Sequence, residues 1–336
     1  MRARHSIHWV LAVGAGVVVV AVALARLAWL TPPPPEPLVI AIADSLLGVP
    51  LRVAEQEGFF TAQGLAVTLR LYPTGKLALD ALLRGQAEVA TVAETPVVFA
   101  ALAGEPLRVI ANYASSGETS LVARADRGIA ELADLKGRRV GTSPGTTAHY
   151  FLHVLLTDQG LTEADVAVVP VPAPEQAAAL AAGRVDAVST FAPYSTQCRL
   201  ALGENARTFP AGLRYNGFAS LVAVPDFSHR RPEAALRLLR ALDRAILWMR
   251  GHDPQARALA ARTLGLPEAV IAETWGRLRP NLALDQGYVI LLQAQARWAI
   301  AAGLAPAAAL PDFPALIDPS ALRRLHPESV TVIGTP

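Results

Sequence analysis

Short apolar runs alternate with helical segments along most of the chain, and this alternation constrains the fold more than any other feature. A run such as LVIAIA at 38–43 is typical of a strand that is buried on both faces of a sheet. The repeated order of strand and helix predicts an α/β fold with mainly parallel sheets flanked by helices. The expected strands are 38–43, 66–72, 89–92, 108–113, 120–123, 139–141, 166–171, 187–190 and 219–224, followed by a largely helical region from 232 onward.

Two similar apolar runs, SLVA at 120–123 and ASLVAV at 219–224, predict two crossings of the chain between two lobes. Residues 124–218 then form one lobe, and residues 38–119 together with 225–336 form the other. A chain of 336 residues is long enough for two such units.

The N-terminus predicts an export signal or a membrane anchor. Basic residues precede an uncharged apolar stretch at 9–25, which is the arrangement of a signal peptide. Extended to 9–30, the segment approaches the roughly 20 residues that span a bilayer, with its positive end on the cytoplasmic side. Residues 1–30 are therefore either a cleaved signal or an uncleaved anchor, and a Pro-rich linker follows at 31–37.

Charge and cysteine content exclude several classes of protein. The chain has 30 basic and 28 acidic residues. Three of the arginines lie in the N-terminal segment, so the body carries 27 basic against 28 acidic residues. A nearly neutral body lacks the basic surface that nucleic acid requires. Cys198 is the only cysteine, which excludes an intrachain disulfide and a cysteine metal cluster.

The stretch DLKGRRVGTSPGTTAHY at 134–150 predicts a strand, a loop of small residues and a helix that begins near Thr146. The first turn of a helix has unpaired N–H groups and a partial positive charge, so this loop is a candidate anion site. Hydroxyl groups at 143, 146 and 147 add possible donors. The alternative is an ordinary helix N-cap, where Ser and Thr are favoured in any protein.

Ligands of open α/β sheets bind beyond the carboxyl ends of strands, and five loops of this chain qualify. Glu94 there is a possible partner for a ligand amine, and Phe191 and Tyr194 are possible stacking faces for a planar or apolar ligand. The alternatives are helix capping for Asp44 and the threonines, solvation for Glu94, and packing between lobes for the aromatic residues. The candidate ligand-binding residues are Asp44, Ser45, Thr74, Gly75, Glu94, Thr95, Ser143, Gly145, Thr146, Thr147, Phe191 and Tyr194.

No catalytic or metal-binding constellation emerges from the sequence. His149 and His153 have the i,i+4 spacing of metal ligands, but no third ligand follows at a readable distance. Cys198 has no identifiable His partner and is expected to be a buried structural residue. We therefore expect no metal, no cofactor and no enzymatic activity.

Five stretches occur in the order of a known family. They are GVPLRVAEQEGFFTAQGLAV at 48–67, ALLRGQAEVATVAETP at 81–96, DLKGRRVGTSPGTT at 134–147, AALAAGRVDA at 178–187 and FAPY at 191–194. On these residues the chain resembles the periplasmic substrate-binding proteins of ABC importers, in the SsuA/THI5-like branch. That branch binds sulfonates, taurine, nitrate or pyrimidine precursors of thiamine, and the resemblance covers about residues 38–310.

The resemblance implies a type II periplasmic-binding-protein fold, in which two hinge strands join two α/β lobes around a ligand. It implies a monomeric periplasmic receptor that delivers a small molecule to an ABC permease and its ATPase. The lipid-anchoring cysteine usual in the family is absent, so membrane contact is expected only through an uncleaved N-terminal helix.

The expected ligand is a small organic anion or zwitterion, either taurine-like or an amino-pyrimidine. The loop at 143–147 favours an anionic group, whereas Glu94 and Asp44 favour a ligand that also carries a cation or an amine. Two alternatives remain: a membrane-tethered sensory receptor, and an enzyme on the same bilobal fold. Certain relatives make a pyrimidine with a pyridoxal cofactor, but this chain lacks their Cys-rich motif.

Overall fold

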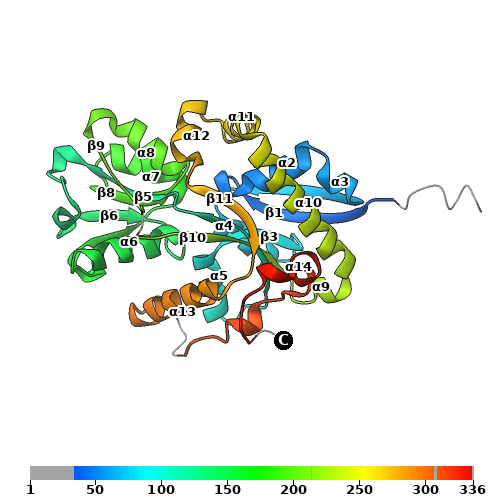
Figure 1. The fold of residues 1–336 in the computed structure, drawn as a ribbon. Helices are drawn as coiled ribbons and strands as arrows, with labels where there is room; N and C mark the ends of the chain where they lie inside the picture. The colour runs from blue at the N-terminus through cyan, green and yellow to red at the C-terminus, as the bar shows by residue number, and fades with distance from the viewer. Residues whose placement is uncertain (1–33, 213, 306–308, 335–336) are drawn as a thin grey trace, which may run out of the picture. The chain divides into compact units, whose positions relative to one another are not determined.

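The predicted strands form two separate sheets (Figure 1). The computed structural model describes residues 34–212, 214–305 and 309–334. The chain divides at residue 36 into two units, and residues 37–336 form one of them. The predicted signal or anchor at 1–30 lies outside the described residues. Within the described part of the chain, no helix combines the length and the apolar character needed to cross a membrane.

The first sheet has six strands in the order β11-β4-β10-β3-β1-β2. Strand β1 is parallel to β3, whereas β10 is antiparallel to both of its neighbours, and β11 is antiparallel to β4. The sheet is therefore mixed, where the alternation of elements predicted a mainly parallel one. The strands are β1 Glu36–Ala43, β2 Leu65–Tyr72, β3 Val89–Ala93, β4 Arg108–Ser116, β10 Gly217–Ala223 and β11 Leu278–Ala283.

The second sheet has five strands in the order β7-β6-β8-β5-β9. Strand β6 is parallel to β7 and β8, and β5 is antiparallel to β8 and β9. Both faces are covered: Leu121 of β5 packs with Phe151 of α6, and the next residue, Val122, packs with Leu180 of α7. The strands are β5 Thr119–Arg124, β6 Arg139–Thr142, β7 Ala167–Pro170, β8 Ala187–Phe191 and β9 Ala206–Pro210.

The chain passes between the sheets at two neighbouring connections. It leaves β4 at Ser116 for β5, and it returns to the first sheet at Gly217. Gly217, the first residue of β10, pairs with Ser116, the last residue of β4. The chain therefore returns to the first sheet beside the point where it left, and β10 must run antiparallel to β4. The predicted crossings 120–123 and 219–224 thus lie on strands of different sheets. Their role as hinges, and the lobe boundaries, stay predictions.

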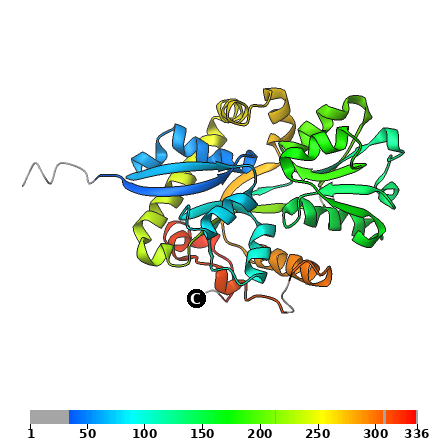
Figure 2. The same ribbon diagram turned by 180° about the vertical axis from the view of Figure 1, so that it is seen from behind.

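The helices pack on the faces of the two sheets (Figures 1 and 2). Helix α13 lies beside α5 in both views, which matters for the site below. The helices that follow strands of the first sheet, including those of the C-terminal region, are α2 Val49–Gln56, α3 Phe59–Ala62, α4 Gly75–Leu83, α5 Glu94–Leu102, α9 Phe227–Arg230, α10 Pro232–Gly251, α11 Asp253–Leu264, α12 Glu268–Trp275, α13 Gln286–Ala301 and α14 Ser320–Leu325. Those of the second sheet are α6 Thr147–Asp158, α7 Gln176–Ala181 and α8 Tyr194–Leu202.

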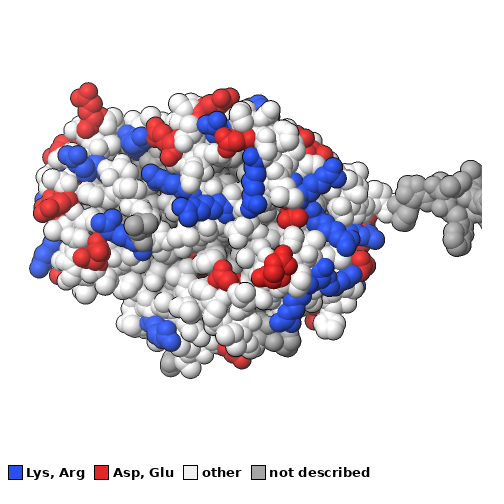
Figure 3. Space-filling view, in the orientation of Figure 1, with Lys and Arg blue, Asp and Glu red and all other residues white. Residues whose placement is uncertain are grey.

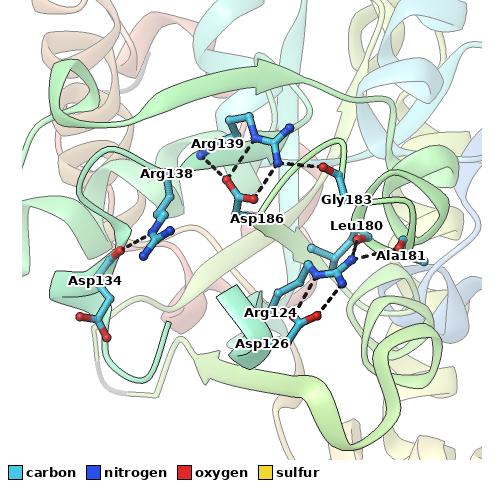
Figure 4. Close-up of polar contacts among 9 residues, drawn as sticks. All are labelled: Arg124, Asp126, Asp134, Arg138, Arg139, Leu180, Ala181, Gly183 and Asp186. Carbon is cyan, nitrogen blue, oxygen red and sulfur yellow. Dashed lines mark hydrogen bonds and ion pairs between the residues drawn. The ribbon is translucent and has the colours of Figure 1, made fainter. Parts of the chain in front are cut away.

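Two of the family stretches meet at the start of β6 and β8 (Figure 4). The Nη2 atom of Arg139 lies 2.8 Å from Oδ1 of Asp186 and also donates to the carbonyl oxygen of Gly183 at 2.8 Å. Asp186 Oδ2 accepts the backbone N–H of Arg139 at 3.0 Å. These bonds, the Arg139 side chain first, lower the pKa of Asp186. These motif residues thus join the amino ends of β6 and β8, whereas the loops predicted to bind a ligand follow the carboxyl ends of these strands.

Candidate ligand-binding site

A cavity of about 50 Å³ lies where the ends of strands from both sheets meet. A cavity of this size holds a few water molecules or one small polar group of a larger solute. A larger hollow of about 600 Å³ lies by α9 and α14, away from these strand ends. The smaller cavity is lined by Ala43, Ser45, Leu47, Thr74, Gly75, Lys76, Thr91, Val92, Ala93, Glu94, Pro96, Tyr113, Ser116, Glu118, Thr119, Thr146, Thr147, Phe191, Gly217 and Phe218.

The amino ends of α4, α5 and α6 all reach this cavity. The first turn of each helix presents N–H groups without intrahelical partners and a partial positive charge. Thr74 caps α4, because its hydroxyl accepts the N–H of Leu77 at 3.2 Å. Gly75 lets α4 approach β3, since a Cβ there would lie 3.3 Å from the carbonyl oxygen of Thr91. The arrangement favours an anionic or strongly polar group in the cavity.

Ser45 reaches the same cavity after β1. Its hydroxyl accepts the N–H of Leu47 at 3.3 Å and so caps the short 3₁₀ helix Leu46–Gly48. The hydroxyl of Tyr113 donates to the carbonyl oxygen of Leu47 at 2.9 Å and holds the same turn from β4. The capping alternative is therefore correct for Thr74 and wrong for Asp44, because the residue that caps after β1 is Ser45. Ser45 and Thr74 also line the cavity.

Glu94 is fully buried at the start of α5 and lines the cavity. Its Oε2 atom accepts the N–H of Phe218 at 2.8 Å, and its Oε1 atom accepts from Nε2 of Gln295 at 3.2 Å. Burial raises the pKa of the Glu94 carboxyl to about 7, against the lowering effect of these hydrogen bonds. The solvated alternative is wrong for Glu94, which instead ties α5 to β10 and α13.

Glu118 is a second buried carboxyl in the cavity, and sequence reasoning missed it. It lies in the connection from β4 to β5 and is 5% exposed. Its Oε2 atom has no hydrogen-bond partner among the described residues. Burial raises the pKa of Glu118 to about 8. In the sequence the residue reads as part of a polar turn, SSGETS, and only the pairing of the strands around it shows that it is buried.

The loop at 143–147 contributes its threonines to the cavity. Thr146 donates its hydroxyl to the carbonyl oxygen of Ser143 at 2.7 Å, so that hydroxyl is already engaged. The Oγ1 atom of Thr147 is buried and finds no partner among the described residues. Ser143 donates to the carbonyl oxygen of Val171 at 2.9 Å, away from the cavity. Of the three predicted hydroxyl groups, that of Thr147 is the one left for a ligand.

The aromatic pair at the end of β8 divides into two roles. Phe191 lines the cavity and packs edge-on against Tyr194, with ring centroids 5.7 Å apart. Tyr194 does not line it. Its hydroxyl donates to the carbonyl oxygen of Pro73 at 3.0 Å and so links α8 to the loop before α4. The packing alternative therefore describes Tyr194.

Five of the predicted residues are not brought to the cavity lining. Asp44 forms an ion pair with Arg52 of α2. Thr95 is buried one position past Glu94, and its hydroxyl has no partner within the part of the chain that the structure describes. Gly145 has φ +72° and faces Lys76 and Phe99. Ser143 and Tyr194 are engaged as described above. A ligand-binding role for any of the twelve residues stays a prediction.

His149 and His153 pack around an aromatic side chain. Their rings lie 5.1 and 5.7 Å from that of Trp298, and His149 Nε2 lies 3.3 Å from Oε2 of Glu163. Among the described residues, no three His, Cys, Asp or Glu side chains are grouped as metal ligands. Cys198 is fully buried, as expected, and burial raises the pKa of its thiol to about 12.

Comparison with known proteins gives a consistent family. A model of the NMT1/THI5-like family matches residues 48–256. An Escherichia coli protein named for binding aliphatic sulfonates is 28% identical over 202 residues, which are 60% of this chain and 63% of that protein. The chain thus spans less than two thirds of that relative's length. The taurine-binding periplasmic protein of the same organism is 23% identical over 68% of this chain and 74% of that protein.

Solved structures share the fold. The alkanesulfonate-binding protein SsuA from Xanthomonas axonopodis pv. citri, bound to MOPS, has a TM-score of 0.74 and 23% identity over 86% of this chain and 100% of that one. The desulfurization enzyme DSZB has a TM-score of 0.63 and 20% identity over 86% of this chain and 98% of that one. The predicted periplasmic-binding-protein fold is therefore confirmed, and it is a fold that both binding proteins and an enzyme use.

Proposed function

The chain belongs to the NMT1/THI5-like family, and from this premise we propose that it is the solute-binding component of an ABC importer. The observation that carries the proposal is the cavity, which residues of both sheets line at the ends of their strands. A solute held there contacts both halves of the molecule at once. That is the arrangement by which a receptor reports occupancy through closure.

The solute is a small organic anion or zwitterion. Three helix amino ends and the free hydroxyl of Thr147 favour an anionic group, as in a sulfonate. Two relatives named for sulfonates and taurine support the same class. Lys76 is the only Lys or Arg among the described residues that line the cavity, and its Nζ atom lies 3.1 Å from Oδ2 of Asp80. The anion is therefore held mainly by N–H and hydroxyl donors.

Binding closes two lobes about the two proposed crossings of the chain, at 120–123 and 219–224. The hydrogen bond from Tyr194 to Pro73 already joins α8 to the loop before α4, and a solute adds contacts on both sides. Labels at residues 165 and 255, on surfaces of the two proposed lobes, should report a shorter distance when the solute saturates the protein. An unchanged distance at saturation would favour a rigid pocket instead.

The protein acts in the periplasm, as a monomer, with a permease and its ATPase as partners. The proposed export rests on the basic and apolar N-terminal sequence and on the periplasmic relative. Basic and acidic side chains are interspersed on the face shown in Figure 3, which suits a soluble receptor. Fractionation of expressing cells tests the location: protein in the cytoplasm with residues 1–30 intact would contradict it.

The test of function is native mass spectrometry of the protein as purified from its own cells. We expect a retained organic anion or zwitterion, and the identified compound should raise the melting temperature of protein stripped by unfolding and refolding. Turnover of that compound would instead indicate an enzyme on this fold, as in DSZB. Genes for a sensor kinase beside this one, in place of permease and ATPase genes, would indicate a sensory receptor.

A further inference from the structure

Glu118 differs from Glu94, the other carboxyl that lines the cavity, because its Oε2 atom has no hydrogen-bond partner among the described residues. Its side chain is 95% buried, with an exposed fraction of 5%. No described residue donates a hydrogen bond to its Oε2 atom. Burial alone raises its pKa to about 8, with no compensating hydrogen bond or cation. Buried polar atoms in native proteins nearly always have a partner, so a missing one needs an explanation.

Glu94 provides the contrast within the same cavity. Both of its oxygens are engaged, one with the N–H of Phe218 and the other with Gln295. A Cβ at Gly217 would lie 3.1 Å from Oε2 of Glu94, so the glycine also makes room for that carboxyl. Glu94 is thus built into the fold, whereas Glu118 lines the same cavity with a buried Oε2 atom that has no partner among the described residues.

The neighbouring groups do not neutralise Glu118 either. Lys76 lines the cavity but has Asp80 as its ion-pair partner. The hydroxyl of Tyr113 is donated to the carbonyl oxygen of Leu47. The hydroxyl oxygen of Ser116 accepts the backbone N–H of Glu118 at 3.3 Å, and the Ser116 hydroxyl forms no hydrogen bond with Oε2 of Glu118. Among the described residues Oε2 of Glu118 thus has no donor, and a solute in the cavity can supply one.

We propose that Glu118 receives a protonated amine or a comparable cationic nitrogen of the bound solute. The inference rests on the proposed function and narrows its ligand to solutes that carry such a nitrogen. A plain sulfonate or nitrate has no N–H to donate, so it cannot stabilise the ionised form of Glu118. The rings of Phe191 and Phe218 line the same cavity, and aromatic faces attract cations.

The experiment uses matched pairs of solutes that differ only in the amine. Taurine is compared with ethanesulfonate, and 4-amino-5-hydroxymethyl-2-methylpyrimidine with the same ring lacking the amino group. Each is titrated by calorimetry into the full-length protein stripped of retained solute. The variants are Glu118→Gln and, as a control, Glu105→Gln, which changes an exposed carboxyl outside the cavity. Circular dichroism and thermal melting establish that both variants are folded.

We expect the wild-type protein to bind at least one amine-bearing solute, and its amine-free partner at least 10-fold more weakly. Glu118→Gln should remove most of that difference, and Glu105→Gln should leave it unchanged. Equal affinity for both members of a pair would overturn the inference and leave the proposed function standing. Equal weakening of both members by Glu118→Gln would also overturn it, because it indicates a structural role. Binding of neither pair overturns the inference too, while the retained solute still decides the proposed function.

Discussion

Glu118→Gln should make the solute-free protein more stable at neutral and alkaline pH. The carboxyl is buried without a hydrogen-bond donor for its Oε2 atom, so its ionised form is disfavoured in the folded state. Glutamine has nearly the same shape and carries no charge at any pH. The substitution therefore removes a charge that the fold itself does not use, which is the expected behaviour of a binding residue rather than of a stabilising one.

The size and sign of the effect follow from the raised pKa. The pKa of Glu118 rises from 4.5 to about 8, and each pKa unit corresponds to about 1.4 kcal/mol. The folded protein binds more protons than the unfolded chain between these values, so the free energy of unfolding falls as pH rises through that window. The full difference is on the order of 5 kcal/mol above pH 8 and vanishes below pH 4.5. Local relaxation and water entry make this an upper value.

The assay is urea denaturation of solute-free wild type, Glu118→Gln and Glu105→Gln from pH 5 to 9. The midpoint of Glu118→Gln should exceed that of wild type by an amount that grows with pH and levels off near pH 8. Glu94, whose pKa is about 7, contributes a similar fall in all three proteins and cancels in the comparison. A constant difference in midpoint across the pH range would refute the reasoning, because it would mean that the pKa of Glu118 is the same in the folded and unfolded states.

Three further predictions concern single side chains. Thr147→Ala should weaken solute binding, measured by calorimetry, and leave the melting temperature almost unchanged. Thr146→Ala should instead destabilise the protein by about 1 kcal/mol, measured by thermal melting. Tyr194→Phe should weaken binding several-fold by removing the hydrogen bond to Pro73, and unchanged affinity would argue against that contact in the bound state. Cys198 should not react with a thiol reagent at pH 8 until the protein is unfolded, because burial keeps it protonated; fast labelling of native protein would contradict this.

The sequence predicted those parts of the candidate site that are positioned by the ends of strands and the starts of helices. Loops at the carboxyl ends of parallel strands must gather at one edge of a sheet, which is why the predicted residues Thr74, Glu94 and Thr147 line one cavity. Two elements were missed at sheet edges, β9 and β11. Strand β11 contains Pro280, and proline is tolerated in strands only at edges or bulges.

What the sequence left open was the direction of individual side chains. Asp44 forms an ion pair with Arg52, eight residues later, and Ser143 donates to the carbonyl oxygen of Val171, which directly follows β7. Neither partner is visible in a local pattern, since each depends on tertiary packing. Glu118 was missed for the same reason: its burial comes from the return of the chain at Gly217, about 100 residues later, beside Ser116.

The cavity joins two opposed electrostatic demands, and a zwitterion satisfies both at once. Helix amino ends at Gly75 and Thr147 favour negative charge, while the open carboxyl of Glu118 favours positive charge. A solute with only an anionic group would leave Glu118 either protonated or repelling it, and a solute with only a cation would leave the helix ends unused. A zwitterion brings no net charge into the buried site. The desolvation cost of each charged end is offset only when that end reaches its own partner in the protein. We therefore predict that selectivity depends on the spacing of the two charged groups in the solute as much as on their identity.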